Sequence, residues 1–219
     1  MSIERLLSLS GSVALVTGAG AGIGRATARR LAEAGAAVVV TDLKAETAEA
    51  VAVDIRGTGG RALAIACDVT REDHLMAAVK AAVDTFGGLT ILVNNAGGGG
   101  PKPFDMPMSD FEWAYKLNVF SLFRLTQLAA PYMEKAGHGA VLNISSMAGE
   151  NKSQRMASYG SSKAAVNHLT RNIAFDLGPK GIRVNCIAPG AIKTDALATV
   201  LTPDIEKAML KHTPLGRLG

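Results

Sequence analysis

The chain alternates short apolar runs with longer segments of helical periodicity, and this alternation constrains the fold more than any other feature. Runs of β type occupy residues 13–17, 36–42, 61–68, 91–95, 140–145 and 183–188. Segments with helical spacing occupy residues 24–35, 44–55, 71–87, 110–135 and 157–177. Apolar strands joined by helices predict a mostly parallel sheet with helices on both faces. We therefore predict an α/β, doubly wound (Rossmann) fold with six strands and right-handed crossovers.

Nothing in the composition divides the 219 residues into smaller units. The chain is 48% apolar, enough for one sizeable core, and no linker-like stretch interrupts it. We expect a single domain over residues 1–219, of the doubly wound kind that commonly binds dinucleotides. In doubly wound sheets, ligands bind at the carboxyl ends of the strands. The functional residues are expected there.

Charge, cysteine and histidine patterns exclude several kinds of partner. The net charge of +4 is scattered, so no nucleic-acid partner is expected. No apolar run approaches the roughly 18 residues of a membrane span, and we expect no membrane partner. Cys67 and Cys186 each lie among apolar residues and are predicted to be buried free thiols in a reducing, cytoplasmic compartment. The four histidines have no ligand spacing, so no metal site is predicted.

A glycine-rich turn follows the first predicted strand and opens the first helix. It reads Thr17, Gly18, then Gly22 and Gly24, in the pattern T-G-x-x-x-G-x-G. Glycines permit a tight turn and a close approach of backbone to a pyrophosphate at a helix N-terminus. An ordinary strand-to-helix turn can look the same, but the position of this one favours a dinucleotide. Ile23 lies inside the turn and is expected to contact the cofactor.

Aspartates end the second and third predicted strands. Asp42 lies 18 residues after Gly24, where a carboxylate can accept hydrogen bonds from both ribose hydroxyls and repel a 2′-phosphate. This predicts NAD rather than NADP as the cofactor. Asp68 is expected beside the adenine edge. Each aspartate has an alternative role as a helix N-cap, which stays equally open for Asp68. The residues that follow the two aspartates, Leu43 and Val69, are expected to contact the cofactor as well.

Tyr159 and Lys163 lie four residues apart in a predicted helix and therefore share one face. An ammonium beside a phenol stabilises the phenolate, so the phenol can act as general acid or base nearer neutral pH. A Tyr–Lys pair on an exposed helix surface, with no catalytic role, would show the same spacing. Ser146, at the carboxyl end of the fifth predicted strand, could hold a carbonyl oxygen beside the phenol. Ser145 is the competitor, and strand alternation points the two serines to opposite sides.

Together these motifs resemble those of the short-chain dehydrogenase/reductase family. The motifs are TGxxxGxG, NNAG, the asparagine of KLNVF, the serine of NISS and YxxxK, in this order, and the likeness runs from Ser12 to Gly219. The resemblance implies an NAD-dependent oxidoreductase, commonly a homotetramer. It implies contacts to the adenosine side of the cofactor from Asn95 and to the nicotinamide amide from Ile192 and Thr194. The implied catalytic tetrad is Asn118, Ser146, Tyr159 and Lys163, with Asn118 anchoring a water that links Lys163 to solvent.

Within this family, three stretches resemble the bacterial 7α-hydroxysteroid dehydrogenases as a group. They are GGGGPKPFDMPM, the ENK segment and AIKTDAL. This resemblance implies a small-molecule substrate, the 7α-hydroxyl of a bile acid. A reductase for another ketone or a 3-oxoacyl substrate stays open, as does a non-catalytic dinucleotide sensor on the same fold. Family members also continue into a further helix and a seventh strand, so we expect the C-terminal segment of the domain to be missing from this sequence.

The glycine run after the fourth predicted strand, NNAGGGGP, is expected to give clearance to ligands. Gly98, Gly99 and Gly100 would form an open shelf for a bulky substrate, with Gly99 in contact with it; a flexible loop is the alternative. Asn151 is expected to reach a polar group of the substrate. Trp113 is predicted to be core. Four methionines could line an adaptable pocket or pack in the core: Met106, Met108, Met147 and Met156.

Overall fold

A six-stranded parallel sheet forms the centre of the protein, and the computed structural model describes residues 7–211 and 213–219. The strand order is β3-β2-β1-β4-β5-β6, and every paired register is parallel. The strands are β1 (Val13–Val16), β2 (Ala37–Asp42), β3 (Arg61–Ala66), β4 (Ile91–Asn94), β5 (Gly139–Ile144) and β6 (Ile182–Ile187). The prediction of a doubly wound sheet with six strands is confirmed.

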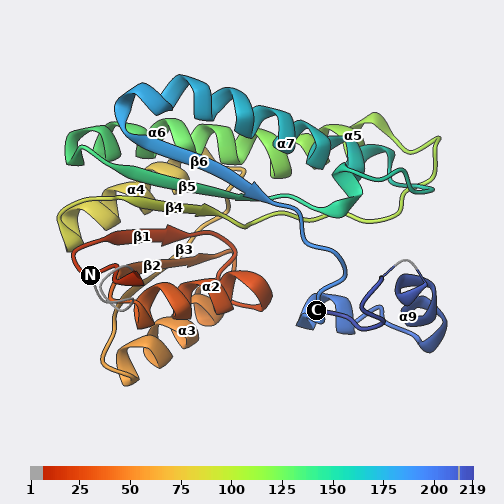
Figure 1. Cartoon of the computed structure of the whole chain (residues 1–219), viewed down its shortest axis with the longest axis horizontal. Helices are drawn as coiled ribbons and strands as arrows, with labels where there is room; N and C mark the ends of the chain where they lie inside the picture. Colours follow the sequence, from red (N-terminus) through yellow and green to blue (C-terminus); the bar gives the residue numbers. More distant parts are fainter. Residues whose placement is uncertain (1–6, 212) are drawn as a thin grey trace.

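Helices cover both faces of this sheet, as predicted. The helices on these faces are α2 (Gly22–Glu33), α3 (Ala45–Gly57), α4 (Glu72–Phe86), α6 (Ser121–Ala136) and α7 (Ala157–Leu177). The shorter helices α5 (Met108–Tyr115), α8 (Asp195–Ala198) and α9 (Pro203–Leu210) follow strands β4 and β6. Figure 1 shows α2 and α3 below the sheet and α6 and α7 above it. Strand residues alternate between two cores: Leu15 packs with α4, α6 and α7, whereas Val16 packs with α2 and α3.

The helical run from Met108 to Ala136 contains a π-helical turn at Lys116–Phe120. The helical segment predicted over residues 110–135 is therefore confirmed, with a π-helical turn at its centre that the pattern did not indicate. The backbone N–H of Ser121 reaches the carbonyl of Lys116, five residues earlier. A π turn inserts an extra residue and is common at functional sites. Here it contains Asn118, a residue of the predicted tetrad.

A buried chain of polar side chains ties the central strands to the helices above them. The Nδ2 of Asn94 donates to Asn143 Oδ1 at 2.8 Å and to Thr126 Oγ1 at 3.2 Å. The Nδ2 of Asn143 donates to Thr170 Oγ1 at 2.9 Å. These bonds link β4 and β5 to α6 and α7. Because unpaired buried polar groups are costly, the chain fixes the register of the elements that carry the site.

The strand order reverses between β1 and β4, which is where doubly wound sheets bind their ligands. After β6 the chain leaves the sheet and forms α8 near α2 and then α9 further out (Figure 1). Arg25 in α2 and Asp195 in α8 form an ion pair at 3.5 Å. The segment after Pro189 therefore faces the glycine turn.

Three further sequence predictions concern the thiols, a membrane span and a metal site. Cys67 is buried, but Cys186 is only half-buried, because it lies near the end of β6, which has β5 as its one neighbour within the described part of the chain. The prediction of two buried thiols is wrong for Cys186. In the same ranges, no helix is long and apolar enough to cross a bilayer, and no group of three or more potential ligands could hold a metal ion.

Candidate active site

The glycine turn between β1 and α2 packs so closely that side chains are excluded from it. A Cβ on Gly24 would lie 2.2 Å from the carbonyl oxygen of Gly18, which itself adopts a left-handed φ of +59°. Helix α2 begins at Gly22 without a side-chain cap from Ala21. Its first backbone N–H groups are therefore open to an anionic ligand.

The loop after β4 is fastened to this turn by hydrogen bonds. The Nδ2 of Asn95 donates to the carbonyl oxygens of Thr17 and Gly18, both at 2.9 Å. The Thr17 hydroxyl oxygen accepts from the backbone N–H groups of Asn95 at 3.0 Å and Ala96 at 2.9 Å. Asn95 thus holds the two loops together in addition to lining the cavity beside them.

Asp42 connects the end of β2 to the glycine turn. Its Oδ2 accepts from the Gly20 backbone N–H at 3.0 Å. Its Oδ1 accepts from Thr47 Oγ1 at 3.1 Å and from the Lys44 N–H at 3.2 Å. The N-cap of α3 is Lys44, so the alternative of an N-cap role for Asp42 is wrong.

Asp68, at the end of β3, is held by Thr70, whose N–H and hydroxyl donate to Oδ1 at 2.9 and 2.7 Å. The N-cap of α4 is Arg71, so an N-cap role is wrong here too. Partial burial raises the pKa of the Asp68 carboxyl, but the Thr70 hydrogen bonds and the charges of His74 and Arg71 outweigh it and hold the pKa below its ordinary value. Burial, followed by the charge of Asp68, raises the pKa of the neighbouring Cys67 thiol to about 11.

These aspartates line a cavity of about 330 Å³ at the carboxyl ends of β1 to β4. The structure brings several of the predicted cofactor residues together here: Gly18, Asp42, Leu43, Asp68, Val69 and Asn95. Trp113 and Leu117 also line it, and sequence reasoning missed both. Trp113 is 51% exposed, so the prediction that it is core is wrong: α5 buries Ala114 and turns the indole to the rim.

A second cavity, of about 490 Å³, adjoins the first at Asn95 and Gly97, which line both. Ser146, Tyr159 and Lys163 line it on one side, and the segment after β6 lines it on the other. The predicted cofactor residues found here are Gly22, Ile23, Asn95, Ile192 and Thr194. These two adjoining cavities, together called the channel below, have the Tyr–Lys pair at one end and the aspartates at the other.

The two serines after β5 have different partners. Ser145 is buried, and its hydroxyl donates to the Lys163 carbonyl oxygen at 3.1 Å. Ser146 is half-buried, and its Oγ accepts from the Ala148 N–H at 3.1 Å while its hydroxyl faces the cavity. The geometry favours Ser146 over Ser145 as the residue that contacts a reacting oxygen, because Ser145 is occupied in fixing α7.

Lys163 is almost fully buried, with an exposed fraction of 4%. Its Nζ donates to the Ile144 carbonyl oxygen at 2.9 Å and lies 5.8 Å from the centroid of the Tyr159 ring. Burial lowers the pKa of the Lys163 ammonium to about 8, because a charge is costly away from water. The two side chains are adjacent on α7, as the spacing predicts.

The Asn118 amide is fully engaged within the protein. Its Oδ1 accepts from the Gly98 N–H at 3.0 Å, and its Nδ2 donates to the Gly98 carbonyl at 2.9 Å and to Ser162 Oγ at 3.1 Å. Ser162 in turn donates to the Tyr159 carbonyl at 2.7 Å. Asn118 therefore fixes the glycine loop against α7. The water-anchoring role implied by the family resemblance stays a prediction.

The glycine run makes room for the tetrad itself. A Cβ on Gly97 would lie 2.8 Å from Asn118 Oδ1 and 3.1 Å from Lys163 Nζ, and a Cβ on Gly99 would lie 2.6 Å from Tyr159 Cδ2. Gly99 also has a φ of +141°. The prediction of an open shelf fits Gly100, where an added Cβ meets nothing within 4 Å. At Gly99 it is wrong, because the Tyr159 ring fills that space.

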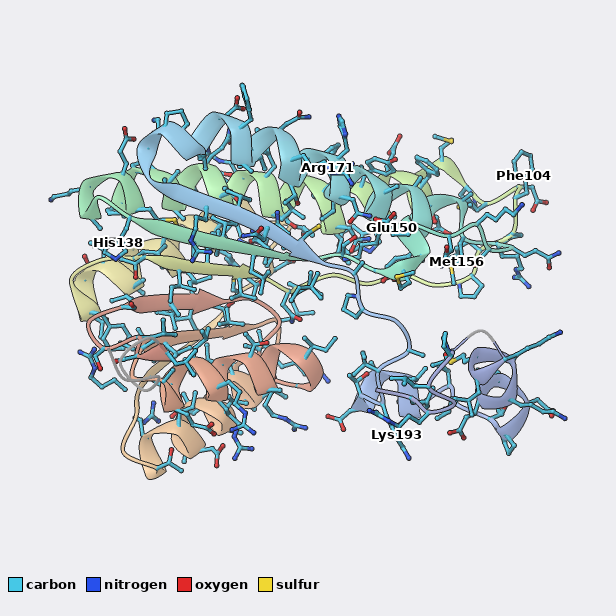
Figure 2. All side chains as sticks on the ribbon, in the orientation of Figure 1. Phe104, His138, Glu150, Met156, Arg171 and Lys193 are labelled. Atoms are coloured by element: carbon cyan, nitrogen blue, oxygen red, sulfur yellow. The ribbon has the colours of Figure 1, made fainter. Side chains whose placement is uncertain are left out.

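The predicted substrate residue Asn151 lies elsewhere, on a cavity of about 670 Å³ beside the start of α7 that Ser146, Tyr159 and Lys163 do not line. Met156 lines the same cavity; Figure 2 shows it near Glu150, with Phe104 at the end of the adjacent loop. Core packing is wrong for all four methionines: Met108 and Met147 are exposed, and Met106 and Met156 are half-buried. Met209 of α9 lines the cavity that holds Ser146, Tyr159 and Lys163, and no sequence signal marked it.

Comparison with known proteins shows the family of the chain. The family model described as short chain dehydrogenase matches residues 12–204, and the chain belongs to this family. It is 60% identical over 213 residues to 7alpha-hydroxysteroid dehydrogenase of Escherichia coli, covering 97% of this chain and 84% of that protein. It is 40% identical over 212 residues to a 2,5-dichloro-2,5-cyclohexadiene-1,4-diol dehydrogenase of Sphingobium indicum, covering 96% and 84%.

One solved structure with a closely similar fold holds a cofactor and a bile acid. It is described as 7 alpha-hydroxysteroid dehydrogenase complexed with NADH and 7-oxo glycochenodeoxycholic acid. This chain matches it with a TM-score of 0.97 and 59% identity, over 100% of this chain and 86% of that one.

The clash at Gly99 gives a first prediction. Gly99→Ala should lower kcat for NAD-dependent alcohol oxidation at least about 100-fold, because the added methyl group displaces the Tyr159 ring from its position. Binding of ADP-ribose, measured by calorimetry, should not change. Gly100→Ala is the matched control, since open space surrounds that position. If both variants turn over like the wild type, Gly99 does not set the position of Tyr159.

The burial of Lys163 gives a second prediction. Lys163→Met should abolish turnover yet raise the free energy of unfolding by roughly 1 to 2 kcal/mol near pH 7, because removing a buried charge outweighs one lost hydrogen bond. The native pKa lies below the unfolded one, so the cost of the charge is fully present below about pH 8. It fades as pH rises toward the ordinary lysine value.

Urea unfolding of the two proteins at about pH 7 and about pH 9.5 measures this difference, which should shrink at the higher pH. Lys135→Met, at an exposed position in the last turn of α6, is the control and should change stability by less than about 0.5 kcal/mol. A Lys163→Met variant less stable than the wild type at both pH values would contradict the account.

Proposed function

We propose that the protein is an NAD-dependent dehydrogenase that oxidises the 7α-hydroxyl of bile acids and reduces the corresponding 7-ketones. The observation that carries the proposal is that the cavity lined by Ser146, Tyr159 and Lys163 adjoins the cavity lined by the aspartates at the ends of β2 and β3. The bile acid is suggested by the relatives, one named as a 7alpha-hydroxysteroid dehydrogenase and one holding NADH and a 7-oxo bile acid.

The channel fits a dinucleotide on three observations. The first N–H groups of α2 are free to receive the pyrophosphate. The Asp42 carboxylate lies where ribose hydroxyls can donate to it. No basic side chain lies within the turn before Gly24 to pair with a 2′-phosphate. When bound, NAD supplies the hydride acceptor for the carbon that carries the hydroxyl.

The residues of this chain then do the remaining chemistry. Tyr159 takes the proton from the substrate hydroxyl, and its phenolate is stabilised by the neighbouring Lys163 ammonium. The Ser146 hydroxyl donates a hydrogen bond to the oxygen that becomes the carbonyl. Lys163 also binds the nicotinamide ribose, and Asn118 keeps the loop and the Tyr159 carbonyl in register. In the reverse direction Tyr159 returns the proton.

Substrate contacts beyond the reacting oxygen are part of the same proposal. Gly99 borders the Tyr159 ring, so its backbone passes beside the reacting group. Asn151 lies on the cavity next to the start of α7 and can meet a polar substituent on the distal part of a long substrate. Met209 and the segment after Pro189 line the opposite wall. We propose that this segment closes over the ligand.

Oxidation of cholate, compared with deoxycholate, which lacks the 7-hydroxyl, tests the substrate. We expect NADH to form with cholate and not with deoxycholate, followed by absorbance. Tyr159→Phe should lower kcat with cholate at least about 1,000-fold while NADH still binds. Equal rates with the two bile acids would show that another hydroxyl reacts. Turnover by Tyr159→Phe close to that of the wild type would remove Tyr159 from the chemistry.

The choice of cofactor has its own test. Asp42→Ala should shrink the preference of kcat/KM for NAD over NADP by roughly 10- to 100-fold, because the charged hydrogen bonds to the ribose and the repulsion of the 2′-phosphate are both lost. Asp42→Asn keeps the shape and the contact to the glycine turn and separates charge from packing. A wild-type protein that uses NADP as well as NAD would contradict the assignment.

We also propose that the protein forms a homo-oligomer, a tetramer, in the cytoplasm. Apolar rings stand exposed on the helices that carry the tetrad: Phe120 is 60% exposed, Phe123 is 41% exposed and Phe175 is 86% exposed. A face of this kind is suited to burial against a second copy. Free cysteines fit a reducing compartment. Light scattering at micromolar concentration should give a multiple of the monomer mass, and a monomer mass would contradict the proposal.

A further inference from the structure

Trp113 is the one tryptophan of the chain, and it stands at a position where core packing does not explain it. Its side chain is 51% exposed, while the adjacent Ala114 is the buried residue of α5. A large aromatic side chain usually buries most of its surface. An indole left half in solvent on an ordered helix therefore points to a missing contact.

The exposed indole stands over the cavity at the ends of β2 and β3. Trp113 and Leu117 lie four residues apart, across the junction of α5 and the π-helical turn, and both line this cavity. Leu117 sits beside the glycine loop, with Cδ2 3.6 Å from the place of a Cβ on Gly98. Trp113 lies one turn further from the loop. The cavity thus has strand ends on one side and this helix face on the other.

The lining of the cavity is suited to a flat aromatic group with polar edges. Leu43 and Val69 supply apolar contacts, and Asp42 and Asp68 stand as acceptors for hydroxyl and amino hydrogens. The indole adds an aromatic surface, which gains from packing against another ring beyond the area it removes from water. An adenine nucleoside combines a flat ring, an exocyclic amine and two ribose hydroxyls.

We propose that Trp113 is a binding residue of the dinucleotide site and packs its indole against the adenine of the cofactor. This inference rests on the proposed function, since it assumes that the aspartate end of the channel takes the adenosine half. It adds a residue from α5 to a site otherwise built from strand ends and the glycine turn. Trp113 thereby also reports binding through its own fluorescence.

Titration with ADP-ribose, followed by calorimetry and by tryptophan fluorescence, tests the proposal. Trp113→Ala should weaken ADP-ribose binding roughly 3- to 10-fold, the range expected for an aromatic pair. Trp113→Phe should recover most of the affinity, because it restores an aromatic face. Nicotinamide mononucleotide should bind Trp113→Ala and the wild type equally, since a structural defect would weaken both ligands.

A matched control is Phe104→Ala, which removes another exposed aromatic side chain, 96% exposed on the loop marked in Figure 2. It should bind ADP-ribose like the wild type. If the wild type binds ADP-ribose and Trp113→Ala binds it equally well, the inference is overturned and the proposed function stands. If the wild-type fluorescence stays constant at saturation, the inference is overturned as well. If the wild type binds no ADP-ribose, the proposed function fails and the inference fails with it.

Discussion

Close packing between the loop after β4 and helix α7 is the constraint on which the site depends. The loop passes so near α7 that Gly97 must leave room for Lys163 and Asn118, and Gly99 must leave room for the Tyr159 ring. The Asn118 amide then forms two hydrogen bonds with the Gly98 backbone and one with Ser162 on α7. Steric exclusion and hydrogen bonding thus fix the same arrangement. A small shift of either element would move the phenol relative to the channel.

The burial of the Lys163 ammonium opposes folding but favours the proposed role of Tyr159 as acid and base. An ammonium at 4% exposure loses most of its hydration and keeps one carbonyl partner, Ile144. Favourable contacts elsewhere offset this free-energy cost. The buried Asn94–Asn143–Thr170 chain and the two apolar cores hold β4, β5 and α7 in place. In a poorly hydrated site the ammonium charge is weakly screened, so it stabilises the phenolate of the adjacent Tyr159 strongly.

Much of the fold and part of the site could be predicted from the sequence, because both depend on local patterns. Six strands and the 157–177 helix follow from periodicity, and α7 spans Ala157–Leu177. Side-chain spacing placed Tyr159 and Lys163 together. The π turn at Lys116–Phe120 has no such local pattern, and its Asn118 is paired with Gly98, which lies in a loop 20 residues earlier.

The errors arise where tertiary contacts decide. Trp113 has a large, mostly apolar side chain, which is typical of a core residue. In the structure, however, α5 turns Ala114 toward the core instead. Gly99 looked like free space for a substrate, and the Tyr159 ring from a distant helix fills it. Met108 and Met147 have side chains typical of a core, but the structure leaves both exposed. In each case the missing information is the direction in which a side chain points.

The most direct measurement is the fate of the hydrogen on carbon 7 of the bile acid. Cholate carrying deuterium at that carbon should transfer it to NAD, so mass spectrometry should find the deuterium in the reduced cofactor formed by the wild type. The Tyr159→Phe variant should give little labelled product in the same time. Reduced cofactor that forms without deuterium would contradict the account, because the hydride would then come from another position of the steroid.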